Sequence, residues 1–320
     1  MVSPLFSLLL QKMPFPKMTG SIKDPSTPDN STHASEQGNS RALTLAICSN
    51  RPANLHQYFE GYIGILQPSD GLLIVLDAQE NVAVRNLTAA FESIGASVLV
   101  NGKNLGLSAS RNIAMDHCPT DYLIFIDDDV VLTKSVVESI RRELEGGAEI
   151  VGVRINGPIE GLKTPWYISD GQLHYLGIHN PSSVMHNTWG ACMGLNRLFV
   201  KSTGIRFRDE LGRKGRDLQC GDDTTFVRDL KEQGAREVFL NQVYAIHNIH
   251  TDRLSLTYML RRAYWQGRSE VRRMDSLNGV RKEWGRFLDS DAGLSKRAFL
   301  ASVYLISVAL GILRESFETH

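Results

Sequence analysis

Short apolar runs alternate with helical segments through the first half of the chain, and this alternation constrains the fold more than any other feature. The apolar runs occupy residues 43–48, 72–76, 97–101 and 122–126. They are continuous rather than interrupted by polar residues, which is typical of strands buried on both faces of a sheet. A helix between successive strands favours parallel pairing. We therefore predict an α/β fold with a mostly parallel, Rossmann-like sheet and helices on both of its faces.

The chain divides by composition into three parts. Residues 18–41 are rich in Ser, Thr, Asp, Asn and Pro, so we expect residues 1–41 to be a disordered leader. No charge precedes its apolar start and no Ala-x-Ala site follows, so we expect no signal peptide. The other parts are an α/β domain at 42–250, with halves 42–157 and 158–250, and a C-terminal helical extension at 251–320.

The second half of the chain has a looser pattern than the first. Strand pieces are expected at residues 172–178, 187–195 and 237–247. Helices are expected at residues 222–233, 254–274 and 298–313.

Charge and cysteine usage exclude several classes of function. Lys plus Arg and Asp plus Glu number 35 each, so the net charge gives no support to a nucleic-acid-binding protein. The cysteines form no Cys-x-x-Cys pair and have no spacing that suits zinc. We expect free thiols in a reducing compartment, which favours a cytoplasmic protein. The cysteines are Cys48, Cys118, Cys192 and Cys220.

Three consecutive carboxylates follow the fourth apolar run, in the sequence YLIFIDDDVVL. In an extended segment Asp127 and Asp129 lie on the same side, and close carboxylates repel each other unless a cation lies near them. A divalent ion such as Mg²⁺ or Mn²⁺ prefers such oxygen ligands and also takes phosphate oxygens. The alternative is a turn with solvated acids, but the buried strand directly before the triplet favours the metal.

Three further groups could hold an anion, move a proton or bind a metal. In NLGLSASRNIAM, Ser108 could cap a helix whose N-terminus, together with Arg111, suits an anionic group. In CGDDTTFVRDL, Asp222 and Asp223 open a helix, and one of them could take a proton from a hydroxyl. His247 ends the last expected strand and could complete a metal site. Ordinary helix capping and an ordinary hydrogen-bonded histidine remain open as alternatives.

These pieces, in this order, resemble the family 2 glycosyltransferases of the GT-A fold. The pieces are CSNRP, IVLDAQ, NLGLSASRN, FIDDDV, GDD, and a histidine followed by RLSLTYMLRRAYWQG. The resemblance covers roughly residues 42–275, and the ordered set is specific although no single motif is. It implies a metal-dependent, inverting enzyme that moves a sugar from a nucleotide-diphosphate sugar, preferably UDP-linked, to an acceptor hydroxyl.

The resemblance also implies roles for individual residues. Asp223 matches the carboxylate that acts as catalytic base, and Asp222 would position the acceptor or the base. The metal ion, Mn²⁺ or Mg²⁺, would be held by Asp129, Asp127 and His247. Donor contacts would come from Arg51, Pro52, Asp77, Arg111, Asp127 and Asp128. Acceptor contacts would come from Trp189 and Gly190 in the segment NTWGACMGL, with a core tryptophan as the alternative for Trp189.

Two differences from the family pattern are visible. The second apolar run is followed by DAQE, where the family has Asp-Asp-Gly-Ser or Asp-Asn-Gly-Ser. The Gln-x-x-Arg-Trp motif of processive synthases is missing, so we expect transfer of a single sugar rather than polymerisation. The acceptor class stays open between a glycan, a lipid carrier and a natural product.

The C-terminal region allows two interpretations. Residues 253–297 hold eleven basic and five acidic side chains, and the apolar run at 298–313 follows directly. This run is shorter than the roughly 20 residues that span a bilayer. Its helix could pack on the domain or in a homodimer. It could instead make a peripheral contact with an anionic membrane leaflet, at the inner face of the plasma membrane.

Two other functions fit parts of the pattern. A nucleotidyltransferase of related architecture usually begins with a Gly-rich phosphate loop, which CSNRPANL lacks. A non-catalytic protein that binds nucleotide sugars would not need Asp129, Asp223 and His247 together.

Overall fold

The structure is a computed structural model that describes residues 41–51, 55, 59–157, 165–180, 187–273 and 294–318. Arg41–His320 forms one compact unit. Residues 1–40 of the expected leader and Pro52 lie outside the described residues, so the leader and the donor contact of Pro52 stay predictions.

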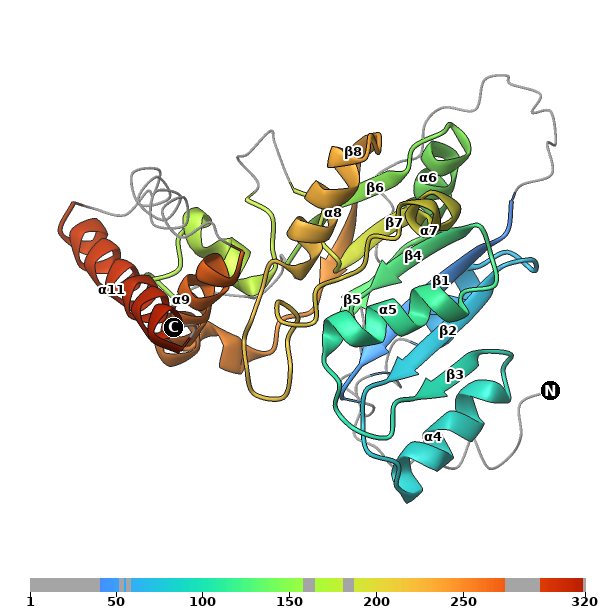
Figure 1. The fold of residues 1–320 in the computed structure, drawn as a ribbon, viewed down its shortest axis with the longest axis horizontal. Coiled ribbons are helices and arrows are strands. Elements are labelled where there is room, and N and C mark those ends of the chain that lie inside the picture. Colours follow the sequence, from blue (N-terminus) through green and yellow to red (C-terminus); the bar gives the residue numbers. More distant parts are fainter. Residues whose placement is uncertain are drawn as a thin grey trace. The chain divides into compact units, whose positions relative to one another are not determined.

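Eight strands within the described residues form one sheet (Figure 1). β1 pairs in parallel with β2 and β4, and β2 pairs in parallel with β3. β7 runs antiparallel to β4 and β6, whereas β6 and β8 are parallel again. The mostly parallel sheet is confirmed. In spatial order the strands are β3 (Ser97–Val100), β2 (Gly71–Leu76), β1 (Leu43–Ser49), β4 (Tyr122–Ile126), β7 (Cys192–Asn196), β6 (Ile150–Asn156), β8 (Glu237–His247) and β5 (Val130–Val131).

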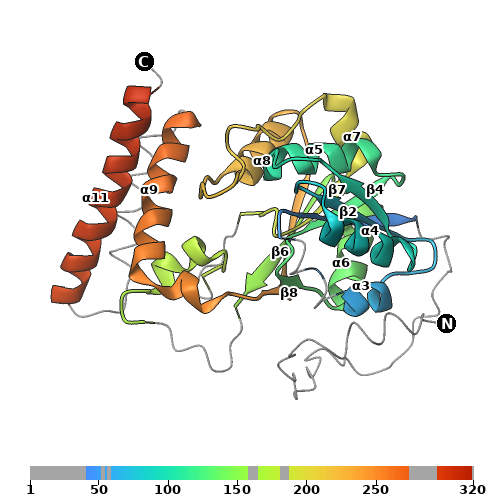
Figure 2. The ribbon, with the colours of Figure 1, turned by 90° about the horizontal axis from the view of Figure 1, so that it is seen from below.

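Helices cover both faces of the sheet, as predicted (Figure 2). One face carries α3 (Phe59–Ile65), α4 (Val82–Glu92) and α6 (Lys134–Glu145). The other carries α5 (Leu107–His117), α7 (Arg197–Thr203) and α8 (Asp222–Glu232). Successive residues of a strand point to opposite faces, so Leu45 packs in the first layer and Ala46 in the second. β1, β2 and β4 are buried on both faces, which explains why their sequences are continuously apolar.

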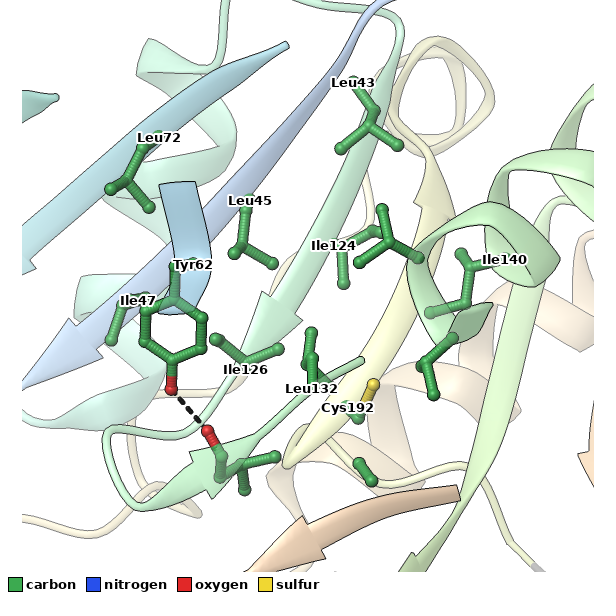
Figure 3. Packing of buried hydrophobic residues seen from close by; sticks show 14 of the residues in the cluster. Leu43, Leu45, Ile47, Tyr62, Leu72, Ile124, Ile126, Leu132, Ile140 and Cys192 are labelled. Atoms are coloured by element: carbon green, nitrogen blue, oxygen red, sulfur yellow. Dashed lines mark hydrogen bonds between the residues drawn. The ribbon is translucent and has the colours of Figure 1, made fainter. Parts of the chain in front are cut away.

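The first layer also fixes the chain directly after the carboxylate triplet. Leu45 and Ile124 from neighbouring strands lie between Tyr62 of α3 and Ile140 of α6 (Figure 3). The Tyr62 hydroxyl donates a hydrogen bond to the carbonyl oxygen of Val130, the first residue of β5. The packed core therefore fixes the position of Val130, the residue directly after the triplet.

Two C-terminal helices, α9 (Leu256–Arg272) and α11 (Leu294–Glu318), lie side by side in both views (Figures 1 and 2). Glycines allow a very close approach. A Cβ atom at Gly311 would lie 1.9 Å from the carbonyl oxygen of Tyr264, and one at Gly267 would lie 2.0 Å from the backbone of α11. Among the described residues, no helix is long and apolar enough to cross a membrane.

The segment between β6 and β7 differs from its prediction. The strand expected at residues 172–178 is wrong, because this stretch forms the 3-10 helix η1 (Asp170–Leu176). A capping box at Ser169 begins η1, and Gly177 ends it with a φ of 74°. Its apolar side chains join a third core with α9 and α11. A second 3-10 helix, η2 (Thr251–Leu254), connects β8 to α9.

Candidate active site

A cavity of about 710 Å³ lies where β1, β2 and β4 end, and it is closed by the end of β8, the start of α8, and residues of η2 and α9. Ligands of α/β sheets bind at this edge because the strands' carboxyl ends meet there. Of the predicted site residues that the structure describes, Gly190 alone is not part of the lining. The lining includes Arg51, Asp77, Arg111, Asp127, Asp128, Asp129, Trp189, Asp222, Asp223 and His247.

The carboxylate triplet forms a turn rather than an extended segment. The backbone N–H of Val130 donates to the carbonyl oxygen of Asp127 at 3.2 Å, and Val130 then pairs with His247 across β5 and β8. The expectation that the triplet is extended is therefore wrong. Asp127 pairs with Arg111, whereas Asp128 and Asp129 share Arg51.

Asp129 lies at the meeting point of three cationic or titratable side chains. Its Oδ1 is 3.0 Å from Nε2 of His247, and its Oδ2 accepts hydrogen bonds from Arg253 at 2.9 Å and Arg51 at 3.2 Å. Burial alone would raise the pKa of Asp129, but the hydrogen bond from His247 and the charges of His247, Arg253 and Arg51 outweigh it and lower the pKa. Asp129 is therefore an ionised carboxylate at neutral pH.

Asp128 contacts the end of β1. The Ser49 hydroxyl donates to its Oδ2 at 2.5 Å, and Arg51 donates to its Oδ1 at 2.7 Å. Burial raises the pKa of Asp128, against the opposing charge of Arg51. With both oxygens in use, Asp128 holds the Ser49–Arg51 corner of the cavity.

Arg111 joins Asp127 to the start of α8. Its Nη2 donates to Asp127 at 3.0 Å and its Nη1 donates to Asp222 at 2.8 Å, while its guanidinium carbon lies 5.5 Å from the centre of the Phe207 ring. Arg111 is 3% exposed. A Cβ atom at position 190 would lie 2.3 Å from this guanidinium, so Gly190 leaves the space that Arg111 fills.

The two carboxylates that open α8 have different surroundings. Burial raises the pKa of Asp222 to about 6, although Arg111 opposes the shift. Asp223 is half-buried in the cavity wall, and its two oxygens accept the backbone N–H groups of Gly190 at 2.9 Å and Thr224 at 2.7 Å. Each oxygen keeps further acceptor capacity, so Asp223 is oriented and still able to accept a proton.

Asp77 is used by the backbone of the next loop. Its carboxylate accepts the N–H groups of Leu105 at 2.7 Å and Gly106 at 2.9 Å, and the side-chain amide of Asn101 at 2.9 Å. It therefore shapes the loop before α5. The helix begins at Leu107 after Gly106, so the predicted side-chain cap by Ser108 is wrong.

Trp189 stacks on His179 with the ring centres 3.8 Å apart. It is half-buried against the first core layer while it lines the cavity, so it packs partly on the core and its acceptor contact stays a prediction.

The donor atoms of Asp129 and His247 are spaced to suit a divalent cation, which would have to displace Arg253 from both residues. An octahedral ion with ligands at about 2.1 Å keeps neighbouring ligands about 3 Å apart, as Asp129 and His247 are. Asp127 faces Arg111 instead. No group of three or more His, Cys, Asp or Glu side chains gathers as a metal site within the described part of the chain. Among the described residues, Asp129 and His247 are thus the candidate ligands, and phosphate oxygens and water would have to supply the rest.

Sequence reasoning named the segment after His247 without assigning roles to its residues. The structure places Arg253, Tyr258 and Arg262 from η2 and α9 in the cavity wall, with Arg213 from the chain before α8. The signal was their position directly behind a site histidine, together with the cluster of arginines.

Comparison with known proteins agrees with this geometry. The model of the family "Glycosyl transferase family 2" matches residues 46–204. The succinoglycan biosynthesis protein ExoM of Rhizobium meliloti is 23% identical over 86% of this chain and 88% of its own length.

A solved structure shares the fold. The mannosyltransferase PcManGT from Pyrobaculum calidifontis, in complex with GDP-Man and Mn²⁺, aligns with a TM-score of 0.56 and 12% identity, over 85% of this chain and 87% of its own. S. aureus TarS in complex with UDP-GlcNAc aligns with a TM-score of 0.49 and 12% identity, over 83% and 72%. The ordered motifs and the family match agree: the chain is a glycosyltransferase of the GT-A fold with a glycosyl transferase family 2 domain at residues 46–204.

Proposed function

We propose that the protein is a metal-dependent, inverting glycosyltransferase that moves one sugar from a nucleotide-diphosphate sugar to an acceptor hydroxyl. One observation carries the proposal. A single cavity holds two separate carboxylates. Asp129 is ionised and pairs with His247, and Asp223 is held in one orientation by a backbone N–H group. Glycosyl transfer needs negative charge to be stabilised on one side of the anomeric carbon and a proton to be removed on the other.

Asp223 is the proposed catalytic base. The acceptor oxygen forms a bond to the anomeric carbon while its proton passes to the Asp223 carboxylate, and the bond to the diphosphate oxygen breaks with its electron pair. The N–H groups of Gly190 and Thr224 hold the carboxylate in one orientation. Asp222 is a positioning residue, because its ion pair with Arg111 ties the start of α8 to Asp127.

The diphosphate side of the reaction is assigned to the triplet. Mn²⁺ or Mg²⁺, bound at Asp129 and His247, would neutralise charge on the leaving diphosphate. Asp127 would join through water or after release from Arg111, and Arg51, Asp128 and Arg111 would line the donor site. Asp77 would act on the nucleotide through the loop that it holds.

Donor and acceptor identities are inferred from resemblance. UDP is the proposed nucleotide, and GDP is the test alternative because PcManGT was solved with GDP-Man. A relative named for succinoglycan biosynthesis favours a glycan or carrier-linked glycan acceptor in polysaccharide assembly. Trp189 lines the cavity and the adjacent Gly190 donates its N–H to Asp223, which supports the proposal that the acceptor binds beside these two residues.

A cytoplasmic location, peripheral membrane contact and a homodimer stay predictions. The outer face of α11 is the surface through which the protein would contact a membrane or a second copy. The helix packs on α9 through one side, which fits the interpretation that it completes the domain. Its opposite side exposes a second apolar stripe. The stripe consists of Phe299, Ile306, Leu310, Leu313 and Phe317.

The test is a thermal-shift screen of UDP- and GDP-linked sugars with Mn²⁺ or with EDTA. A matching donor at a hundred times its Kd should stabilise the protein by about 2.7 kcal/mol. His247→Gln should remove the Mn²⁺-dependent part of this shift.

Asp223→Asn should lower kcat by about 10²–10⁴-fold while donor binding persists. Asp229→Asn, on the same helix but outside the cavity lining, is the matched control. Unchanged transfer by Asp223→Asn, or stabilisation by no nucleotide sugar, would refute the proposal.

A further inference from the structure

Among the described residues, the cavity wall contains guanidinium groups that no carboxylate neutralises. Arg213 and Arg262 line the cavity and form no salt bridge with any described residue. Arg262 is 5% exposed, and its Nη1 donates to the carbonyl oxygen of Leu218 at 3.0 Å. Its Nε has no hydrogen-bond partner within the described part of the chain. By contrast, Arg51 and Arg253 in the same cavity are paired with the triplet.

Tyr258 lies among these arginines. Its hydroxyl is buried and, within the described residues, has no hydrogen-bond partner. Burial would raise the pKa of Tyr258, but the positive charges of Arg213, Arg262 and Arg253 outweigh it and lower the pKa. The hydroxyl therefore lies in a region of positive potential.

Such an arrangement has a cost in the absence of a ligand. Buried polar groups are almost always hydrogen-bonded, and a buried charge without a partner is strongly destabilising. Two unneutralised guanidinium groups and an unsatisfied hydroxyl converging on one cavity indicate that an anion belongs there. Phosphate fits best, because arginine forms paired, charge-assisted hydrogen bonds with phosphate oxygens and a phenol adds a third donor.

The position of the cluster identifies which phosphate. Arg253 connects the cluster to Asp129, to which it donates at 2.9 Å. The carbonyl oxygen of Arg213 accepts the N–H of Leu107 at 2.8 Å, at the first residue of α5. Both contacts lie on the donor half of the site, beside the triplet and the helix that carries Arg111.

We propose that Arg213, Tyr258 and Arg262 form a phosphate subsite that receives the diphosphate of the nucleotide donor. This inference rests on the proposed function. It means that the two arginines, and not only a metal ion, stabilise the leaving diphosphate. As the bond from the anomeric carbon to the diphosphate oxygen breaks, the added negative charge falls within reach of these donors. A share of the diphosphate affinity is then independent of any divalent ion.

The experiment compares variants that do not disturb the fold. Tyr258→Phe removes a hydroxyl without a protein partner, so its Tm should equal that of the native chain. Arg213→Gln removes a half-buried charge that has no salt bridge. Tyr264→Phe, on the same helix but outside the cavity lining, is the matched control.

Binding of UDP, GDP, their nucleosides and inorganic phosphate is measured by calorimetry in EDTA and again with Mn²⁺. With the nucleotide that the native protein binds, Tyr258→Phe and Arg213→Gln should each weaken diphosphate binding about tenfold in both buffers. Nucleoside binding and the control variant should be unchanged.

The results separate the two proposals. If the native protein binds a nucleoside diphosphate and both variants bind it equally well, the subsite is refuted while the proposed function stands. If both variants lose inorganic phosphate binding but keep diphosphate affinity, the cluster serves a phosphate elsewhere and the donor assignment is wrong. If the native protein binds neither diphosphate in either buffer, the proposed function itself fails.

Discussion

Replacing Arg111 by methionine tests the ionic framework of the site most directly. Arg111 is 3% exposed, and among the described residues it alone forms ion pairs with both Asp127 and Asp222. Methionine keeps the apolar packing on Phe207 but leaves both acids unpaired. Removing one partner of a buried ion pair costs about 3–5 kcal/mol. Because the Asp127 side chain is 30% exposed and can rehydrate, we expect about 3 kcal/mol, with Asp222 as the main contributor.

The pH dependence of this loss follows from Asp222. Its pKa is already raised to about 6 in the folded protein, and without Arg111 it should rise further, since that charge opposes the shift. A carboxyl group with a raised folded-state pKa favours the folded state at low pH and loses that contribution as pH rises through the folded pKa. The destabilisation of Arg111→Met should therefore be small at pH 5 and large at pH 8.

The assay is urea denaturation at both pH values, with Arg206→Met as control. Arg206 pairs with Asp116 through a shorter contact of 2.5 Å, but both side chains are about half exposed, so its loss should cost less than about 1 kcal/mol. Adding Asp222→Asn to Arg111→Met should recover part of the stability at pH 8. If Arg111→Met costs no more than Arg206→Met, or costs the same at pH 5 and pH 8, the buried ionic framework is not as we describe it.

Further predictions concern the C-terminal helices. Gly311→Ala should destabilise the protein by about 1–3 kcal/mol in urea because the new methyl would meet the backbone of α9, whereas Gly64→Ala in α3, with open space around it, should be neutral or stabilising. Glu315→Gln should lower stability at pH 7. Burial would raise the pKa of Glu315, but hydrogen bonds from arginines of α9 outweigh it and lower the pKa. The stabilisation by the ionised carboxylate is therefore lost as pH falls below about 4.5, and the native protein and Glu315→Gln should then be equally stable. Leu310→Lys should leave the Tm unchanged but abolish any self-association seen by sedimentation or any binding to anionic vesicles.

The sheet could be predicted from sequence because its signal is local. A strand buried on both faces needs an unbroken apolar run, and β1, β2 and β4 each show one. The strand at Glu237–His247 was predicted with its observed bounds, and α8 ends one residue earlier than expected. The 3-10 helix at Asp170–Leu176 was missed because alternating apolar residues fit a strand equally well. Its burial depends on α9 and α11, which lie far away in sequence.

The candidate residues were found from their order along the chain, but their partners were not. Arg111 and Asp222 are 111 positions apart, and nothing in either segment shows that they touch. The turn after β4 also depends on distant residues, since Tyr62 and His247 both act on Val130. Arg213, which no motif singled out, reaches the cavity through loop packing against α5.

The pairing of acids with arginines explains how the fold tolerates a carboxylate triplet at the end of a buried strand. Two like charges about 4 Å apart repel by about 4 kcal/mol at an effective dielectric of about 20, so three unpaired carboxylates would oppose folding. Each acid instead has its own cation, with Arg111 at Asp127, Arg51 at Asp128 and Arg253 at Asp129. A diphosphate and a divalent ion entering together carry nearly cancelling charges, so they can join this network without unbalancing it. A diphosphate without its metal needs additional cations, and Arg213 and Arg262, which have no carboxylate partner among the described residues, are placed to supply them.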